Sequence, residues 1–313
     1  MTNRKVCLIV IFNHRYEQNI PKLHAYYSPR FSKIKYIVPF IPKPHPQGTI
    51  RVVENGFTFS GHIAQAARDF IEEDVSCYAF IGDDLILNPR LNEDNFESAL
   101  EVNSTTGYIK SLASVDPLRY CWHSAVNAAV DLLRAGFNYK SELPPAKEAR
   151  ERFERMGFRF GVGKPSIANL IWCLKRSKSV PFWFMRLISM TGRESAYPLL
   201  AGYSDFVTVP STSIDRFVHF CGVFSAMNMF AEVAIPTALA LAVDDVRTEL
   251  IRGDHFASPN ARRNPDMKLQ GLEFWEGKGS EFAERLGYNF GHLIDDFPED
   301  RLYVHPVKLS KWK

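Results

Sequence analysis

Strand-like and helix-like segments alternate over residues 6–90, and this alternation restricts the possible folds more than any other feature of the sequence. Residues 6–12 form a continuous apolar run rich in β-branched side chains, which is typical of a strand buried on both faces. Similar runs occupy residues 34–40 and 77–81. Between the last two runs, apolar residues at helical spacing follow Ser60, which is a good helix N-cap. Since strand–helix–strand units make right-handed crossovers, we expect an α/β protein with a mixed, mainly parallel sheet flanked by helices.

The rest of the chain is less regular. Residues 41–49 contain three prolines and a glycine, so we expect a loop there. Residues 206–209 and 302–304 have the composition of short strands, and residues 224–243 predict a long apolar helix. The sequence contains no internal repeat and no low-complexity linker. We therefore expect a single globular unit, which a chain of 313 residues is long enough to build around a sizeable core.

The overall composition excludes several classes of protein. The chain has 38 Lys and Arg against 35 Asp and Glu, a net charge of +3, and we expect no nucleic acid as a partner. Its five cysteines are widely spaced and odd in number, which argues against a disulfide framework. The apolar run at residues 6–12 is too short for a secretory signal. Residues 217–243 are apolar but include Glu232, so a buried helix is a better interpretation than a membrane span.

These features predict a cytoplasmic protein, since free thiols suit a reducing compartment. Residues 175–186 mix lysine and arginine with aromatic side chains. Such a segment suits peripheral contact with the inner face of a membrane, the lining of an acceptor cleft, or ordinary packing with a basic rim, and the sequence does not choose among the three.

An acidic pair directly after a predicted strand is the clearest chemical signal. Asp83 and Asp84 follow the run at residues 77–81, separated from it by Gly82. In parallel sheets ligands gather at the carboxyl ends of strands. Adjacent carboxylates repel each other unless a cation or hydrogen-bond donors offset their charge, and Mg²⁺ and Mn²⁺ prefer oxygen ligands. We therefore predict that both aspartates bind a divalent metal ion. An ordinary surface turn, in which Asp is common, is the alternative.

The segment from Tyr78 to Pro89 reads YAFIGDDLILNP, and it resembles the metal-binding "DxD" segment of GT-A fold glycosyltransferases. The family often has three acidic positions here, and Gly82 occupies the first of them. Residues 12–15, FNHR, resemble the base-contacting loop after the first strand of such enzymes. Residues 55–67 resemble the helix start that lies over their donor. The resemblance implies a GT-A-like, Rossmann-like fold, with Asn13 and Arg15 orienting a nucleotide.

Two later features are similar to the same family. Glu232 lies in an apolar stretch, where burial should raise its pKa and suit a general base, and it resembles the last acidic position of the family's "xED" motif. A buried structural glutamate is the alternative. The family also has a C-terminal histidine that completes the metal site and a basic residue after it that contacts phosphate. His305, followed by Lys308 and Lys311, is similar to that pattern, and a frayed basic tail is the alternative.

Together these residues imply a glycosyltransferase with Mn²⁺ or Mg²⁺ as cofactor. It would move a sugar from a nucleotide diphosphate donor to a hydroxyl of a glycan or lipid-linked acceptor, in surface polysaccharide biosynthesis. Residues 1–120 would form the donor-binding half and residues 121–313 the acceptor-binding and catalytic half of one domain. A metal-dependent nucleotidyltransferase and a non-catalytic sugar- or partner-binding relative of the same fold remain as alternatives.

Overall fold

A computed structural model of the chain describes residues 5–42, 46–54, 59–115, 136–160, 197–251, 263–274 and 277–313. Residues 175–186, for which membrane contact is one prediction, lie outside these ranges. So does the predicted boundary between the two functional halves at residue 120. Among the described residues, no helix has both the length and the apolar character needed to cross a lipid bilayer.

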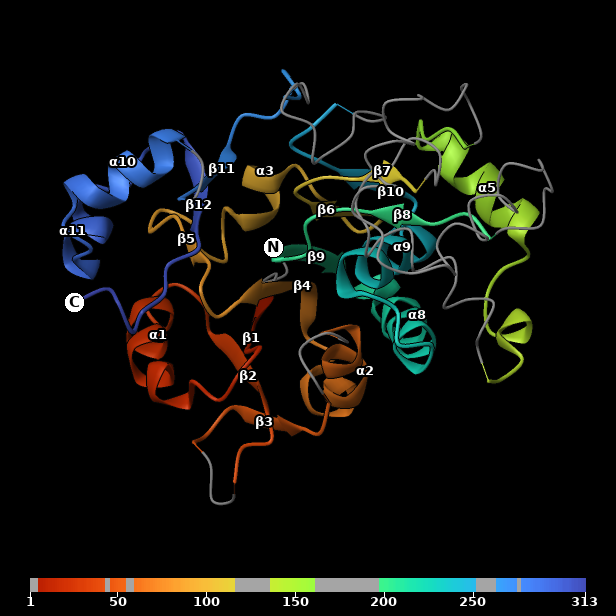
Figure 1. Ribbon diagram of the computed structural model, residues 1–313, viewed down its shortest axis with the longest axis horizontal. Coiled ribbons are helices and arrows are strands. Elements are labelled where there is room, and N and C mark those ends of the chain that lie inside the picture. The colour runs from red at the N-terminus through yellow and green to blue at the C-terminus, as the bar shows by residue number, and fades with distance from the viewer. Residues whose placement is uncertain are drawn as a thin grey trace, which may run out of the picture.

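A seven-stranded sheet forms the centre of the protein (Figure 1). From one edge to the other its strands are β10 (Asp245–Arg247), β6 (Thr106–Ile109), β9 (Phe206–Pro210), β4 (Val75–Gly82), β1 (Lys5–Ile11), β2 (Lys33–Pro39) and β3 (Thr49–Val52). Strand β9 runs antiparallel to its neighbours β4 and β6, and every other adjacent pair is parallel. The prediction of a mixed, mainly parallel sheet is therefore confirmed.

Two smaller sheets flank the central one. The first contains β11 (Gln270–Glu273), β12 (Arg301–His305) and β5 (Ile86–Leu87), and the second pairs β7 (Ala113–Ser114) with β8 (Leu200–Ala201). Strand β12 is parallel to β11 and antiparallel to β5. Because β5 follows closely after β4, this pairing brings a strand near the carboxyl end of the chain to the edge of the central sheet where β4 ends.

Helices cover both faces of the central sheet (Figure 1). One face packs against α2 (Phe59–Phe70), α5 (Ala146–Arg155), α8 (Ile214–Ala226) and α9 (Ala231–Ala242). The other packs against α1 (Ile20–Tyr27), α3 (Phe96–Leu100), α10 (Gly277–Arg285) and α11 (Phe290–Asp295). Short 3₁₀ segments lie at η1 (Glu17–Asn19), η3 (Tyr139–Ser141) and η4 (Ser211–Ser213). Both faces of the sheet are therefore removed from water.

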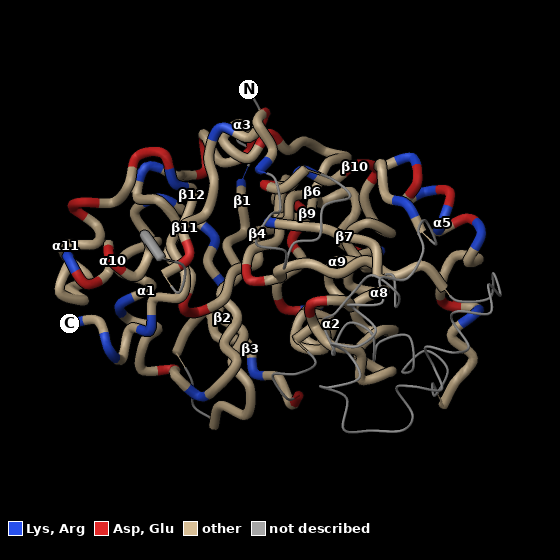
Figure 2. The backbone as a smooth tube through the Cα atoms, turned by 45° about the horizontal axis from the view of Figure 1, so that its top comes forward, with Lys and Arg blue, Asp and Glu red and all other residues tan. Residues whose placement is uncertain are grey.

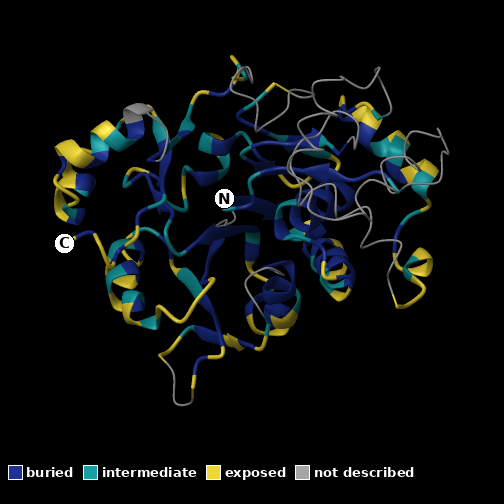
Figure 3. Ribbon diagram, viewed as in Figure 1, coloured by how far each residue is buried: buried dark blue, intermediate teal, exposed yellow. Residues whose placement is uncertain are grey.

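Strand β1 shows why its sequence is continuously apolar. Side chains alternate across a strand, so Cys7 and Ile9 contribute to the core beneath α2 and α8, whereas Leu8 and Val10 contribute to the core beneath α1. All four residues have no measurable exposure to solvent. Figure 3 shows the same pattern as a band of buried strands between the two helical layers. A polar residue on either face would lose its hydration, which accounts for the unbroken run.

Three predictions about the elements differ from the structure. Ser60, predicted to precede its helix as the N-cap, lies inside α2. The loop predicted over residues 41–49 ends one residue early, because Thr49 begins β3, a four-residue edge strand that the sequence analysis missed. The long apolar helix predicted over residues 224–243 is wrong, since α8 ends at Ala226 and α9 begins at Ala231. Between them Asn228 has a φ of 55°, and this left-handed conformation interrupts the helix.

Charged side chains are mixed in sign on the described surface. Figure 2 shows basic and acidic positions interspersed along α5, whose sequence AKEARERFER alternates the two. Both signs also occur around α10 and α11 (Figure 2). The expectation that nucleic acid is not a partner stays a prediction.

Candidate active site

Polar side chains gather at the edge of the central sheet where the parallel strands end. Asp83 and Asp84 follow β4, and Lys110 follows β6. Because β9 is antiparallel, the residue before its first position, Asp205, lies at the same edge. The N–H of Gly82 donates a hydrogen bond to the carbonyl oxygen of Asp205 over 2.9 Å, which fixes the two loops against each other. Three strands distant in sequence therefore contribute charged groups to one place.

Strand β12 adds His305 to this edge. Its pairing with β5 places its last residue beside the acidic pair, and the Val307 N–H donates to the carbonyl oxygen of Asp84 over 2.6 Å. The Nε2 atom of His305 lies 3.4 Å from Asp84 Oδ1 and 3.8 Å from Asp205 Oδ1. The ring is nearly buried, with 5% of the residue exposed. The structure thus brings together Asp84 and His305, two of the three residues that the sequence analysis assigned to a metal.

The other side of the His305 ring contacts a buried carboxylate. Its Nδ1 atom lies 3.0 Å from Oε2 of Glu273, the last residue of β11. Oε1 of Glu273 forms an ion pair with Lys110, whose ammonium group lies 4.7 Å from the centre of the Tyr203 ring. The hydroxyl of Tyr303 lies 3.5 Å from the same Oε1 atom. A chain of charged groups therefore runs from Lys110 through Glu273 and His305 to the aspartates.

These contacts determine the charge of His305 and Asp84. Burial alone opposes a charged ring, but the carboxylates of Asp84 and Glu273 outweigh it and raise the pKa of His305 to about 10. Burial would likewise raise the pKa of Asp84, yet the His305 imidazolium beside it holds that pKa below its usual value. The pair is therefore an ionised carboxylate with a protonated imidazole when no metal is bound.

Three other carboxyl groups at this edge have raised pKa values. Burial, followed by the negative charge of Asp84, raises the pKa of Asp83 to about 7. Burial, followed by the charge of Asp205, raises the pKa of Glu232 to about 8. Burial also raises the pKa of Asp205 itself. Buried carboxyl groups with raised pKa values therefore cluster at this edge, which is typical of functional sites.

Glu232 lies in the first turn of α9, and its pKa responds to both Asp205 and His305, so it faces the same cluster. Its carbonyl oxygen accepts a hydrogen bond of 3.0 Å from the N–H of Gly202. The sequence analysis placed Glu232 inside a long apolar helix, and the structure places it at the start of a shorter one. Its raised pKa agrees with the predicted effect of burial, and its role as a base stays a prediction.

The predicted nucleotide-contacting residues lie nearby but are exposed. Asn13 and Arg15 follow β1 at the same edge of the sheet. The Arg15 guanidinium forms a 3.0 Å ion pair with Glu17. Neither residue contacts the acidic cluster in any described interaction, and their assignment to the donor stays a prediction.

The two predicted phosphate-binding lysines differ in position. Lys308 is exposed, and its charge helps to lower the pKa of Asp84. Lys311 is also exposed, and its backbone N–H donates to the carbonyl oxygen of Lys308 over 2.7 Å. The tail is not frayed, because Trp312 is buried and stacks on Phe274 with ring centres 5.4 Å apart. Of the two lysines, Lys308 is the one whose charge reaches the acidic pair.

The donor set at this edge suits a hard divalent cation. Asp83, Asp84 and Asp205 offer carboxylate oxygens and His305 offers an imidazole nitrogen, which are ligand types used by Mg²⁺ and Mn²⁺. Burial is the main cause of the raised pKa values of Asp83 and Asp205, and a bound cation would favour their charged forms. Within the described ranges no three acidic, histidine or cysteine side chains already have the arrangement of a metal site.

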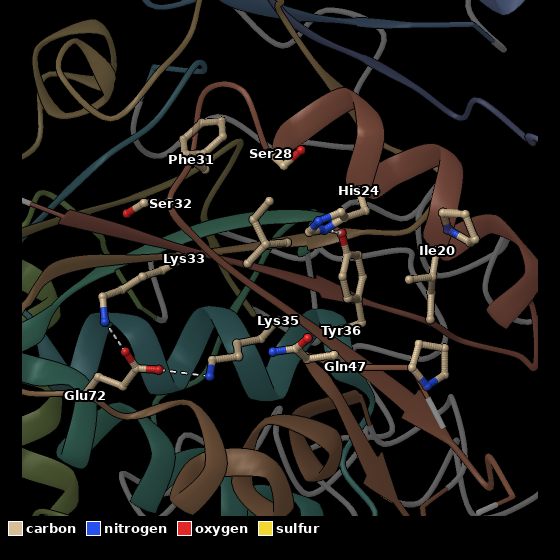
Figure 4. A pocket seen from close by; sticks show the side chains of 14 residues that line it. Ile20, His24, Ser28, Phe31, Ser32, Lys33, Lys35, Tyr36, Gln47 and Glu72 are labelled. Atoms are coloured by element: carbon tan, nitrogen blue, oxygen red, sulfur yellow. Dashed lines mark hydrogen bonds and ion pairs between the residues drawn. The ribbon is translucent and has the colours of Figure 1, made fainter. Parts of the chain in front are cut away.

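A separate cavity of about 740 Å³ opens at the other end of β2, between α1 and the loop before β3 (Figure 4). Glu72 forms ion pairs there with Lys33 and, over 2.9 Å, with Lys35. Lys33 also pairs with Asp74 over 2.7 Å, and Lys5 pairs with Asp74 over 2.9 Å, so two carboxylates are shared by three lysines. Since Lys33 begins β2, this cavity lies at the amino ends of the parallel strands and is distinct from the cluster around His305.

The sequence analysis named none of Glu273, Lys110 and Asp205 as a site residue. Lys110 follows β6 at the ligand-binding edge, so the rule that singled out Asp83 would have found it if that strand had been predicted. Asp205 precedes β9 and lies at this edge only because β9 is antiparallel, which the sequence does not reveal. Glu273 ends a four-residue strand in a region that resembled polar loop. Only its pairing with β12 reveals that it is buried beside a histidine.

Comparison with known proteins adds no assignment to this geometry. No protein-family model matches the sequence. The search of curated proteins finds no significant match either. The site's own residues therefore carry the functional conclusion.

Proposed function

We propose that the chain is a metal-dependent glycosyltransferase of the GT-A type, which transfers a sugar from a nucleotide diphosphate donor to an acceptor hydroxyl. One observation carries the proposal: the 3.4 Å contact between Asp84 Oδ1 and His305 Nε2 at the carboxyl edge of the sheet. The resemblance to glycosyltransferases predicted that these two residues share one metal site, although most of the chain separates them.

The donor would bind across this edge. Asp83, Asp84 and His305 would hold the metal ion, and a divalent ion there would neutralise the diphosphate as it leaves. Lys308 would add a positive charge on the phosphate side, and Asn13, with Arg15 beside it, would orient the nucleotide at the end of β1. The residues given these roles all lie at one edge of the sheet, which supports a single donor site.

The acceptor would lie towards Glu232. Its carboxylate would take the proton from the acceptor hydroxyl while that oxygen bonds to the anomeric carbon of the sugar and the bond to the diphosphate breaks. A base needs a pKa close to the working pH, and the value of about 8 for Glu232 meets that condition. Asp205, whose charge acts on Glu232 and whose Oδ1 lies 3.8 Å from His305 Nε2, would bind hydroxyl groups of the sugar or the acceptor.

Nucleotide binding tests the proposal directly. We expect UDP or GDP to bind the wild-type protein in the presence of Mn²⁺ and to bind much more weakly in EDTA, as measured by calorimetry. His305→Ala should weaken this Mn²⁺-dependent binding more than it weakens binding of the bare nucleoside, because a nucleoside has no diphosphate to share the metal. A matched control is His24→Ala, since His24 lines the separate cavity at the amino end of β2.

The alternatives give different results in the same experiment. A metal-dependent nucleotidyltransferase would bind nucleoside triphosphates with Mn²⁺ and release pyrophosphate from them. A non-catalytic relative would bind a sugar or a partner without hydrolysing or transferring a nucleotide sugar. Absence of any metal-dependent nucleotide binding by the wild-type protein would refute the glycosyltransferase proposal.

A further inference from the structure

Glu273 receives two charged hydrogen-bond donors in a nearly dry environment. Its Oε2 atom lies 3.0 Å from His305 Nδ1, and its Oε1 atom pairs with the ammonium group of Lys110. Only 4% of Glu273 and 5% of His305 are exposed. Each oxygen of the Glu273 carboxylate therefore accepts from a different charged donor. The His305 ring is held between Glu273 and Asp84.

We propose that Glu273 is the positioning residue for His305, holding a hydrogen on Nδ1 so that Nε2 is the nitrogen presented to a metal ion. This inference rests on the proposed metal site and adds a residue to it. A histidine that binds a metal through one nitrogen usually donates its other N–H to a carboxylate or carbonyl, which fixes the ring orientation and the tautomer. The 3.0 Å contact to Glu273 meets that requirement without any rearrangement.

The carboxylate is essential because an amide cannot satisfy both donors. A glutamine at position 273 has one acceptor oxygen and one NH₂ group. Lys110 has no acceptor, so the amide oxygen would turn towards its ammonium group and the NH₂ would face His305 Nδ1. An NH₂ group there favours a lone pair on Nδ1 and moves the ring hydrogen to Nε2, where it blocks metal binding.

Glu249 supplies a matched control in the same layer of the protein. It is 2% exposed, and its carboxylate accepts hydrogen bonds from the Tyr108 hydroxyl and from the N–H of Gly271, the latter over 3.1 Å. Its hydrogen-bonding partners are these two groups and not His305. Glu249→Gln therefore replaces a second buried carboxyl group, one whose pKa burial raises, without altering the proposed support of the metal ligand.

The first experiment measures the affinity for Mn²⁺ alone by electron paramagnetic resonance of the free ion. Glu273→Gln should bind Mn²⁺ about 10- to 100-fold more weakly than the wild type, the usual effect of losing a partner of a metal-bound histidine. Glu249→Gln should bind as the wild type does. Lys110→Met in the Glu273→Gln background should restore part of the affinity, because the amide oxygen is then free to accept from Nδ1. Equal Mn²⁺ affinity for Glu273→Gln and wild type would overturn the inference and leave the proposed function standing.

A second experiment uses metal-free protein, so it does not depend on metal binding. Nuclear magnetic resonance of ¹⁵N-labelled histidine should show a slowly exchanging Nδ1–H on His305 in the wild type and in Glu249→Gln, but not in Glu273→Gln. If the wild-type protein lacks this signal, Glu273 does not position the ring, even if the variant fails to fold. If the wild type shows the signal but binds no Mn²⁺, the proposed function fails and the positioning by Glu273 stands.

Discussion

Replacing Asp83 with asparagine should stabilise the metal-free protein at neutral and alkaline pH. Its carboxyl group is partly buried beside Asp84, which is ionised and paired with His305. These surroundings raise its pKa from an ordinary value of 3.8 to about 7. Asparagine keeps the size and much of the hydrogen bonding of the side chain and removes the charge. The residue proposed to bind a metal would therefore cost stability when the metal is absent.

The pKa sets the size and the pH range of the effect. Between about pH 4 and pH 7 the folded protein binds more protons at Asp83 than the unfolded chain does, so the free energy of unfolding falls as pH rises through this window. The full shift corresponds to about 4 kcal/mol at 1.36 kcal/mol per pKa unit. Because solvent reaches part of the side chain, we expect a gain of about 1–2 kcal/mol for Asp83→Asn at pH 8 and less at pH 5.

Urea denaturation in EDTA at pH 5 and pH 8 measures this gain, with Asp84→Asn as the matched control. The pKa of Asp84 is lowered by its His305 partner, so its loss should destabilise the protein instead. Adding Mn²⁺ should then stabilise the wild type by mass action and stabilise Asp83→Asn far less. If both variants shift stability in the same direction at pH 8, the assignment of opposite electrostatic environments to the two aspartates is refuted.

Three further predictions concern the residues around this pair. Glu232→Gln should lower turnover about 10²- to 10⁴-fold with little change in donor affinity. Steady-state kinetics over pH 6–9 should show a wild-type rate that rises towards pH 8, and this rise should be absent in the variant. Lys308→Gln should weaken binding of a nucleoside diphosphate about tenfold, as expected for a charge-assisted contact, whereas Lys311→Gln should change it little; equal losses in calorimetry would contradict this ranking. Trp312→Ala should lower the free energy of unfolding by about 3–5 kcal/mol because its buried ring stacks on Phe274, and a smaller loss in urea denaturation would mean that the tail is loosely attached.

The sequence was sufficient for the elements whose pattern is local. Strands β1 and β4 are buried on both faces, so each appears as an apolar run that needs no tertiary information. Strand β2 is buried over Tyr36–Pro39, while Lys33 and Lys35 at its start are half-buried. The acidic pair stood out because it directly follows such a run, at the end of a strand where ligands bind. His305 was found only through its resemblance to a family pattern, since an isolated histidine near the end of a chain has no distinctive spacing.

Other features depend on contacts between distant segments. Strand β3 has only four residues, with Arg51 exposed between buried Ile50 and Val52, and so short an alternation does not separate a strand from a loop. The break at Asn228 lies within an otherwise apolar stretch, and propensity alone does not locate it. Glu273 is buried in a strand that pairs with β12, and the residues next to it in the sequence do not indicate this pairing.

The pairing of β12 with β5 has a consequence for how the protein acquires its site. Asp84 and His305 lie far apart in the sequence, so the entropy of closing the long loop between them has to be offset before the site can form. Formation of the site is therefore a non-local event of folding. A chain in which β12 has not paired with β5 lacks the histidine at this edge, so binding there would report that this pairing has formed.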